Sequence, residues 1–252
     1  SEDLAAIERP VTIDAAAVDE SLGKVRQVLE TFDRFLPVKK GMLQGFFGSP
    51  PLVAEEELRA RAGRFDLAPY AARLAALVDE HDRVVADLAA ARAVAGGLEP
   101  WAPMEADLEE LHAPVRSCIV TVRATTAQHQ ALVALVDGSG AADDICSQEI
   151  GRDDRTVHGA WIALLGRRTM LEDMVRRAGA TLIKLPNLPG TPGANLARLA
   201  DEVTRLERRR DELATALTTE AAENREPARA VFDELAARRR ELTVPKSFFT
   251  TS

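Results

Sequence analysis

Hydrophobic positions recur at helical spacing in three long stretches of the chain. In the first, apolar residues from Val18 to Leu36 follow one another at steps of three or four, which places them on one face of a helix. Asp14 is a suitable N-cap for this helix, and Pro37 ends it. The pattern predicts an amphipathic helix from Asp14 to Leu36, followed by a loop rich in glycine and proline over residues 39–51.

The other two stretches each keep a heptad seam, with apolar residues at alternating steps of three and four. The outgoing stretch is predicted to begin at Glu55 and to be interrupted by Gly96, Gly97 and Pro100. The returning stretch opens with Thr191 as a cap and Pro192 at the first helical position. The outgoing seam is Tyr70, Leu74, Leu77, His81, Val84, Leu88, Ala91 and Ala95, and the returning seam is Leu196, Leu199, Val203, Leu206, Arg210, Leu213 and Leu217.

The two seams have nearly the same length, and a helix with one apolar stripe needs a partner to cover it. We therefore expect an antiparallel two-helix coiled coil, in which the returning helix continues to Pro245. Pro227 lies inside that helix and is expected to kink it or to mark a break, because proline removes a backbone hydrogen bond.

The segment between the seams, from Val115 to Pro186, predicts a small α/β lobe. Four short runs have the composition of strands, at residues 117–123, 144–150, 157–165 and 181–185. Two capping boxes, Thr125 with Gln128 and Thr169 with Glu172, predict helices between them. The order is β-α-β-β-α-β, that of the ferredoxin-like unit, whose sheet buries one face under its two helices.

The predicted fold class is therefore α+β and mostly α: a long coiled-coil hairpin with a ferredoxin-like lobe at its tip. The expected divisions are an N-terminal helix and loop forming part of a proximal lobe (1–54), an outgoing arm (55–112), the distal α/β lobe (113–188), a returning arm (189–245) and a tail (246–252).

Composition narrows the class of protein further. The net charge is −8 over 252 residues, which gives no bulk attraction to nucleic acid or to an anionic membrane surface. The sequence contains no apolar run of ~20 residues, the length that a bilayer requires, and no signal peptide is expected at its start. Cys118 and Cys146 fall on predicted strands, where we expect buried, reduced thiols.

Catalytic and metal-binding motifs are missing from the sequence, so we expect neither an enzyme nor a cofactor or metal site. His81 lies on a seam, where a polar residue commonly sets the register, and His112, His129 and His158 fall on separate elements. The arginine runs at 208–210 and 238–240 have acidic neighbours, which favours solvated, salt-bridged faces over docking patches. Trp161 is either a core residue or a half-exposed contact.

Four segments in order resemble the cytosolic N-terminal domain of V-type ATP synthase subunit I, the family that includes subunit a of vacuolar ATPases. They are FDRFLPVKKGML at 32–43, LEPW at 98–101, GATLIKLPNLPGTPGANLARLADEVTRLE at 179–207 and VPKSFFTTS at 244–252. The first lobe strand lacks the glycine-proline ending expected of the family. The family's opening strand and its membrane half would lie outside Ser1–Ser252, so the family's proton chemistry is assigned to no residue here.

The resemblance implies a non-catalytic stator arm on the cytoplasmic face of the membrane. Such an arm resists torque and links the membrane half, next to its ring, to the peripheral stalks. The implied partners are a peripheral-stalk heterodimer and the cap subunit of the central rotor, with no nucleic acid. The expected partner-binding residues of the lobe are Trp161, Arg167, Arg168, Glu172 and Arg176.

Two other functions remain open from the sequence. One is a free-standing coiled-coil scaffold whose lobe mediates dimerisation; DNA binding with a steep salt dependence would favour it. The other is a small-molecule sensor, which rests on analogy with other ferredoxin-like units. A ligand-induced rise in melting temperature would support the sensor.

Overall fold

The computed structural model describes residues 15–37, 66–113 and 115–243. It divides into two compact units, which are treated separately below. The helical unit contains the described residues up to Arg83 and those from Arg209 onward, and the sheet unit spans Val84–Arg208. The predicted cap at Asp14, the loop at 39–51 and the helix start at Glu55 lie outside the described residues.

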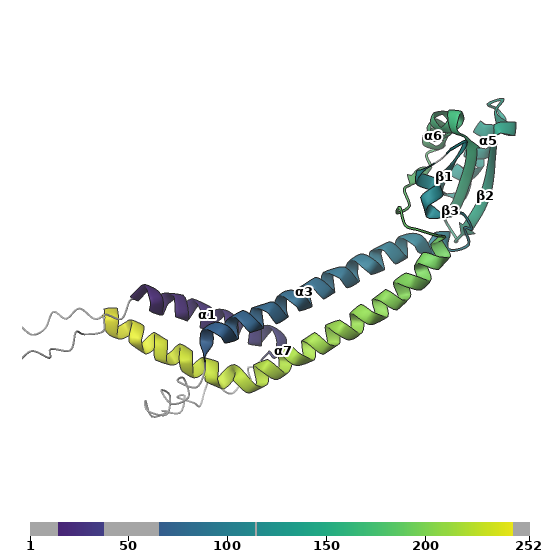
Figure 1. The fold of residues 1–252 in the computed structure, drawn as a ribbon. Coiled ribbons are helices and arrows are strands. Elements are labelled where there is room, and N and C mark those ends of the chain that lie inside the picture. The colour runs from purple at the N-terminus through teal and green to yellow at the C-terminus, as the bar shows by residue number, and fades with distance from the viewer. Residues whose placement is uncertain (1–14, 38–65, 114, 244–252) are drawn as a thin grey trace, which may run out of the picture. The chain divides into compact units, whose positions relative to one another are not determined.

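Three helices form the core of the helical unit (Figure 1). They are α1 (Ala15–Phe35), the first part of α3 (Leu67–Leu98) and the last part of α7 (Pro192–Thr243). The first helix spans nearly the predicted residues. Val18, Val25 and Phe32 of its predicted stripe are buried and the rest of the stripe is half-buried, while Val28 is buried outside the stripe. The core residues are Val25, Val28 and Phe32 of α1, Leu74 of α3, and Leu217, Ala221, Ala228 and Val231 of α7.

Helices α3 and α7 run in opposite directions where they meet. In the helical unit, Arg73 pairs with Glu220 at 3.1 Å and Glu80 pairs with Arg209 at 2.6 Å, so rising numbers on one helix meet falling numbers on the other. In the sheet unit, Arg92 pairs with Glu207. Every predicted seam residue on both helices is buried or half-buried, as the heptad pattern indicates.

The outgoing helix ends within the predicted interruption, whereas the returning helix has no break at Pro227. Helix α3 continues through Gly96 and Gly97 to Leu98, and α7 continues through Pro227. A glycine costs about 1 kcal/mol and an interior proline about 3 kcal/mol in a helix. Burial of Leu98 opposes the cost of the glycines, and the joint burial of Leu217, Ala221, Ala228 and Val231 stabilises α7 on both sides of Pro227.

The sheet unit has the predicted order of strands and helices. Its elements are β1 (Ser117–Ala124), α5 (Thr126–Asp137), β2 (Ile145–Arg152), β3 (Val157–Leu164), α6 (Arg168–Arg177) and β4 (Thr181–Ile183). The strand order is β2-β3-β1-β4, and all neighbouring strands are antiparallel. β4 ends at Ile183, two residues before the predicted end.

The two central strands, β1 and β3, are buried on both faces, so the prediction of one buried face is incomplete. Helices α5 and α6 cover one face, where Leu132 and Leu171 pack with Trp161 of β3. The other face is covered by the turn η1 (Glu99–Trp101) and the short helix α4 (Leu108–His112). There Trp101 and Leu108 pack with Ala160 of β3, and the ring of Trp101 meets that of His158 edge-on at 5.5 Å.

Only one of the two predicted capping boxes forms. The Thr125 side chain accepts from the Gln128 N–H at 3.2 Å, and the Gln128 side chain accepts from the Thr125 N–H at 2.9 Å. The box predicted at Thr169 and Glu172 is wrong. A single 3₁₀ turn leads directly into α6, whose N-cap is Arg167, so Thr169 already lies inside the first turn.

This difference predicts that two threonine substitutions have different effects. Thr125→Ala should lower the stability of the sheet unit by about 1 kcal/mol, because it leaves a helix N–H without its acceptor. The matched control Thr169→Ala should change it by less than about 0.5 kcal/mol, because Thr169 is exposed and caps nothing. Urea denaturation followed by tryptophan fluorescence measures both, and equal effects would contradict the assignment.

Candidate functional site

Four of the five predicted partner-binding residues lie together on the sheet unit, at the start of α6 and along it. The side chains of Arg167, Arg168 and Arg176 are 48%, 45% and 59% exposed, and that of Glu172 is 25% exposed. We call these four residues the α6 face. Within the described part of the chain, these four side chains are exposed enough for a partner protein to contact them.

Trp161 does not belong to the α6 face. It is 2% exposed and packs in the core beneath α5 and α6, because β3 is a central strand and its alternate residues point into that core. Of the two alternatives considered for Trp161, the structure supports the core residue. The prediction that Trp161 is a partner-binding residue is therefore wrong.

Ion pairs hold the arginines of the α6 face. Nε of Arg168 donates to Glu172 at 2.8 Å, and a guanidinium nitrogen of Arg176 lies 3.8 Å from the same carboxylate. Arg167 donates to Asp144 at 3.1 Å, and Arg176 also pairs with Asp173. The hydrogen bond that Arg168 donates to Glu172 raises the pKa of Arg168. Arg168 and Arg176 are balanced by Glu172 and Asp173, and Arg167 is balanced by Asp144, so each arginine of the α6 face has an acidic partner.

The histidines and cysteines form no reactive cluster in the described residues. No group of three or more His, Cys, Asp or Glu side chains has a metal-binding arrangement there. Cys118 is buried as predicted, but Cys146 is exposed, because β2 is an edge strand and this side chain faces away from the core. Burial lowers the pKa of His158, which packs against Trp101.

The arginine runs form salt-bridged faces, as the acidic neighbours indicate. Arg209 binds Glu80 across the two long helices and Glu212 on its own helix. Arg239 donates to Asp19 of α1 at 2.6 Å, and Arg238 pairs with Glu234. The pairs Arg209–Glu80 and Arg239–Asp19 link helices of the helical unit, and the other two pairs lie within α7.

Seam residue His81 has a structural setting rather than a catalytic one. Its ring meets that of Phe35 edge-on at 5.1 Å, and its Nδ1 lies 3.0 Å from Asp82. Arg34 of α1 donates to the same carboxylate. The hydrogen bonds from Arg34 and His81 lower the pKa of Asp82 from 3.8 to about 2.

Asp82 therefore contributes stability that depends on pH. A carboxyl with a lowered pKa in the folded state stabilises the fold above its unfolded pKa, and this contribution is lost as the pH falls toward 2. Its side chain is 47% exposed, so solvent screening limits the contribution to about 0.2–1 kcal/mol. Asp82→Asn should destabilise the helical unit by this amount at pH 7 and by progressively less between pH 4 and pH 2. Urea denaturation at several pH values measures the difference, with exposed Asp79→Asn as the control; a constant difference would contradict the assignment.

The comparisons with known proteins agree with this architecture. No family model and no curated protein sequence matches the chain. Among solved structures, the chain is similar to the cytoplasmic N-terminal domain of subunit I, homolog of subunit a, of V-ATPase. The TM-score is 0.58 at 13% identity, and the match covers 89% of this chain and 72% of that chain. The likeness shows a shared fold. Among the described helices, none is both long and apolar enough to cross a bilayer.

Proposed function

We propose that this chain is the cytosolic stator arm of a rotary V-type ATPase and has no catalytic role of its own. The observation that carries the proposal is the structural likeness to the subunit I domain over 89% of the chain. The resemblance of four ordered sequence segments to the same family supports it independently of the coordinates. The arm would lie on the cytoplasmic face of the membrane and take part in proton-driven ATP synthesis or in ATP-driven proton transport.

The mechanical part of the proposal rests on the two long helices. We propose that α3 and α7, which lie within the predicted arms 55–112 and 189–245, form an antiparallel coiled coil that resists bending while the rotor turns. The buried heptad positions and the ion pairs between α3 and α7 support this. A seam that is buried along its length must be broken before the pair of helices can bend sharply.

The binding part of the proposal assigns the contact surface to the lobe, residues 113–188, with a ferredoxin-like sheet. The strand order β2-β3-β1-β4 supports that assignment. The α6 face, with Arg167, Arg168, Glu172 and Arg176, would contact the helices of a peripheral-stalk heterodimer. The cap subunit of the central rotor is a second proposed partner, and the membrane ring would be reached through the membrane half of the subunit.

Charge reversal on the α6 face tests this function. The triple variant R167E/R168E/R176E should weaken binding to the purified peripheral-stalk heterodimer by about tenfold or more, because arginines at the centre of an interface carry much of its affinity. A matched control, R155E/R205E/R208E, reverses three exposed arginines elsewhere on the sheet unit. Calorimetry measures both. Equal affinities for the two variants would refute the proposed surface, and an absence of binding by the unmodified chain would refute the function.

A further inference from the structure

Strand β1 is fully paired on one side and only partly paired on the other. It pairs with β3 along all eight of its residues, from Ser117 to Ala124. On the opposite side it pairs with β4 only at Thr121, Val122 and Arg123. After Ile183 the chain leaves the sheet. In the part of the chain that the structure describes, residues 117–120 of β1 therefore have no strand partner on the β4 side; we call this stretch the open edge.

A groove of about 300 Å³ lies at the open edge. Its floor includes Ile119 of β1, and Leu182 and Leu185 form apolar walls. Nε2 of His112 lies 3.0 Å from the carbonyl oxygen of Leu185, which fixes the wall beyond the end of β4. The groove also includes Arg168 and Glu172, so it adjoins the α6 face.

Large apolar side chains are exposed at the groove and near the start of β1. Leu182 is 37% exposed at the groove. Val115, two residues before β1, is 86% exposed, and Leu164, which is the register partner of Ser117, is 52% exposed. The register places Leu164 and Leu182 on opposite faces of the sheet, so Leu182 is the exposed apolar side chain of the groove itself. Exposed large apolar side chains beside a strand edge are compatible with an interaction site.

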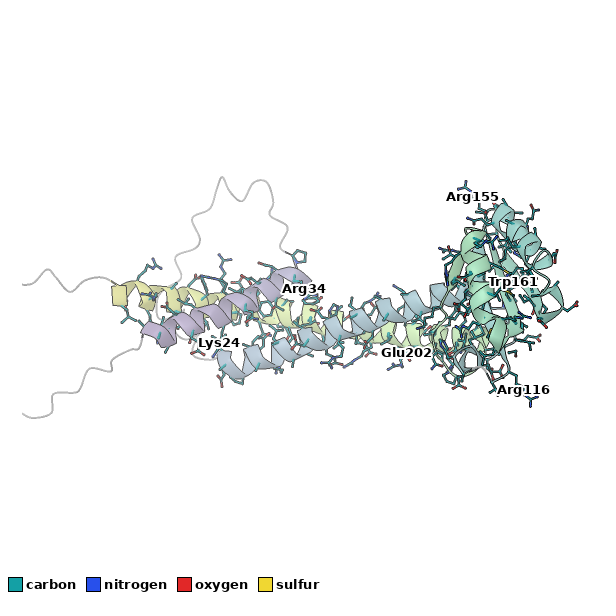
Figure 2. The ribbon with its side chains drawn as sticks, turned by 90° about the horizontal axis from the view of Figure 1, so that it is seen from above. Lys24, Arg34, Arg116, Arg155, Trp161 and Glu202 are labelled. Atoms are coloured by element: carbon teal, nitrogen blue, oxygen red, sulfur yellow. The ribbon has the colours of Figure 1, made fainter. Side chains whose placement is uncertain are left out.

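The charge around the open edge is positive, although the whole chain carries −8. Lys184 and Arg168 line the groove, and Arg116 precedes β1. Lys184 and Arg116 have no ion pair within the described ranges, whereas the one acidic residue of the groove, Glu172, is already bound to Arg168. Figure 2 shows the Arg116 side chain projecting away from the sheet unit. Charge complementarity therefore favours an acidic occupant.

We propose that an extended, carboxylate-bearing segment of a partner protein adds to the sheet along the open edge. Its backbone would pair with residues 117–120, alternate apolar side chains would enter the groove, and carboxylates would meet Lys184, Arg168 and Arg116. This inference rests on the proposed function for the identity of the partner, which would be a peripheral-stalk subunit. The chemistry of the groove is independent of that identity.

A synthetic peptide tests the chemistry without any ATPase subunit. The probe is a fluorescein-labelled octapeptide of alternating Val and Glu, titrated with the full chain and followed by anisotropy. We expect saturable binding that weakens about tenfold or more in the double variant R168E/K184E. The matched control R155E/R205E should leave it unchanged, because Figure 2 shows Arg155 projecting at a different end of the sheet unit. Circular dichroism verifies that both variants are folded.

Backbone methylation distinguishes strand addition from simple charge attraction. N-methylation of one alternate set of peptide amides should abolish binding, and methylation of the other set should not, because only one edge of an added strand faces β1. The inference is overturned if the Val/Glu peptide does not bind, if neither methylated form loses affinity, or if an alternating Val/Lys peptide binds equally well. Binding of phosphatidylglycerol vesicles through Lys184 and Arg168, without peptide binding, would also overturn it. Each of these results would overturn strand addition alone. The proposed function is tested separately, by binding of the unmodified chain to the stalk heterodimer.

Discussion

Trp101→Ala should lower the free energy of unfolding of the sheet unit by about 3–5 kcal/mol. Trp101 is 1% exposed and packs with Leu98, Met104 and Leu108 over the second face of the sheet. Removal of the indole leaves a cavity between this cover and Ala160 of β3, and the loss of transfer energy and of packing add together. Trp161, the other tryptophan of the chain, remains in the variant as a fluorescence probe of the same unit.

Two variants control this experiment. Trp101→Phe retains an aromatic ring over the sheet and should cost clearly less than the alanine variant. Val115→Ala removes an exposed apolar side chain and should change stability by less than about 0.5 kcal/mol. If Trp101→Ala cost no more than Val115→Ala, the second face of the sheet would not be part of the core.

Phe32→Ala should loosen α1 from the helical unit, with a loss of about 3–5 kcal/mol. Phe32 is fully buried, and its ring meets that of Tyr70 on α3 at 6.4 Å. An amphipathic helix of 21 residues depends on tertiary packing for most of its stability, so α1 should open locally when this contact is removed. Hydrogen exchange measures the effect as faster exchange of the α1 amides, while the amides of β3 serve as an internal reference.

The matched control is Glu30→Ala on the same helix. Glu30 is exposed, and alanine is a good helix former, so exchange of the α1 amides should hardly change. Equal acceleration in the two variants would mean that helix propensity, and not the buried ring, holds α1 in place.

The sequence was most informative where a local pattern alone determines the structure. The heptad steps placed all the seam residues, from Tyr70 to Leu217, on the less exposed faces of α3 and α7. The capping box at Thr125 and the order of strands in the lobe were also readable, because both depend on neighbours close in sequence.

It was less informative where distant segments decide the outcome. Pro227 suggested a kink or a break, but α7 continues through it as a helix whose Ala228 and Val231 are buried in the core of the helical unit. Thr169 had the spacing of a cap, but the turn entering α6 starts the helix two residues earlier than such a cap would allow. Neither effect is visible in the local sequence.

The candidate site was predicted in part for the same reason. The four charged residues of the α6 face were predicted from the resemblance to subunit I, and the structure leaves all four at least partly exposed. Trp161 was ambiguous, since an aromatic residue on a strand suits a core and an interface equally until the position of β3 in the sheet is known. The open edge of β1 was not foreseen, because it results from the early end of β4 at Ile183.

Site-specific photocrosslinking in the cell tests the stator assignment most directly. A benzophenone amino acid placed at Arg176, on the α6 face, should crosslink to a peripheral-stalk subunit of a rotary ATPase, identified by mass spectrometry. The same group placed at Arg155, which projects elsewhere from the sheet unit, should give no such product. Crosslinks from Arg176 to a protein of an unrelated complex, or to a second copy of this chain alone, would contradict the account.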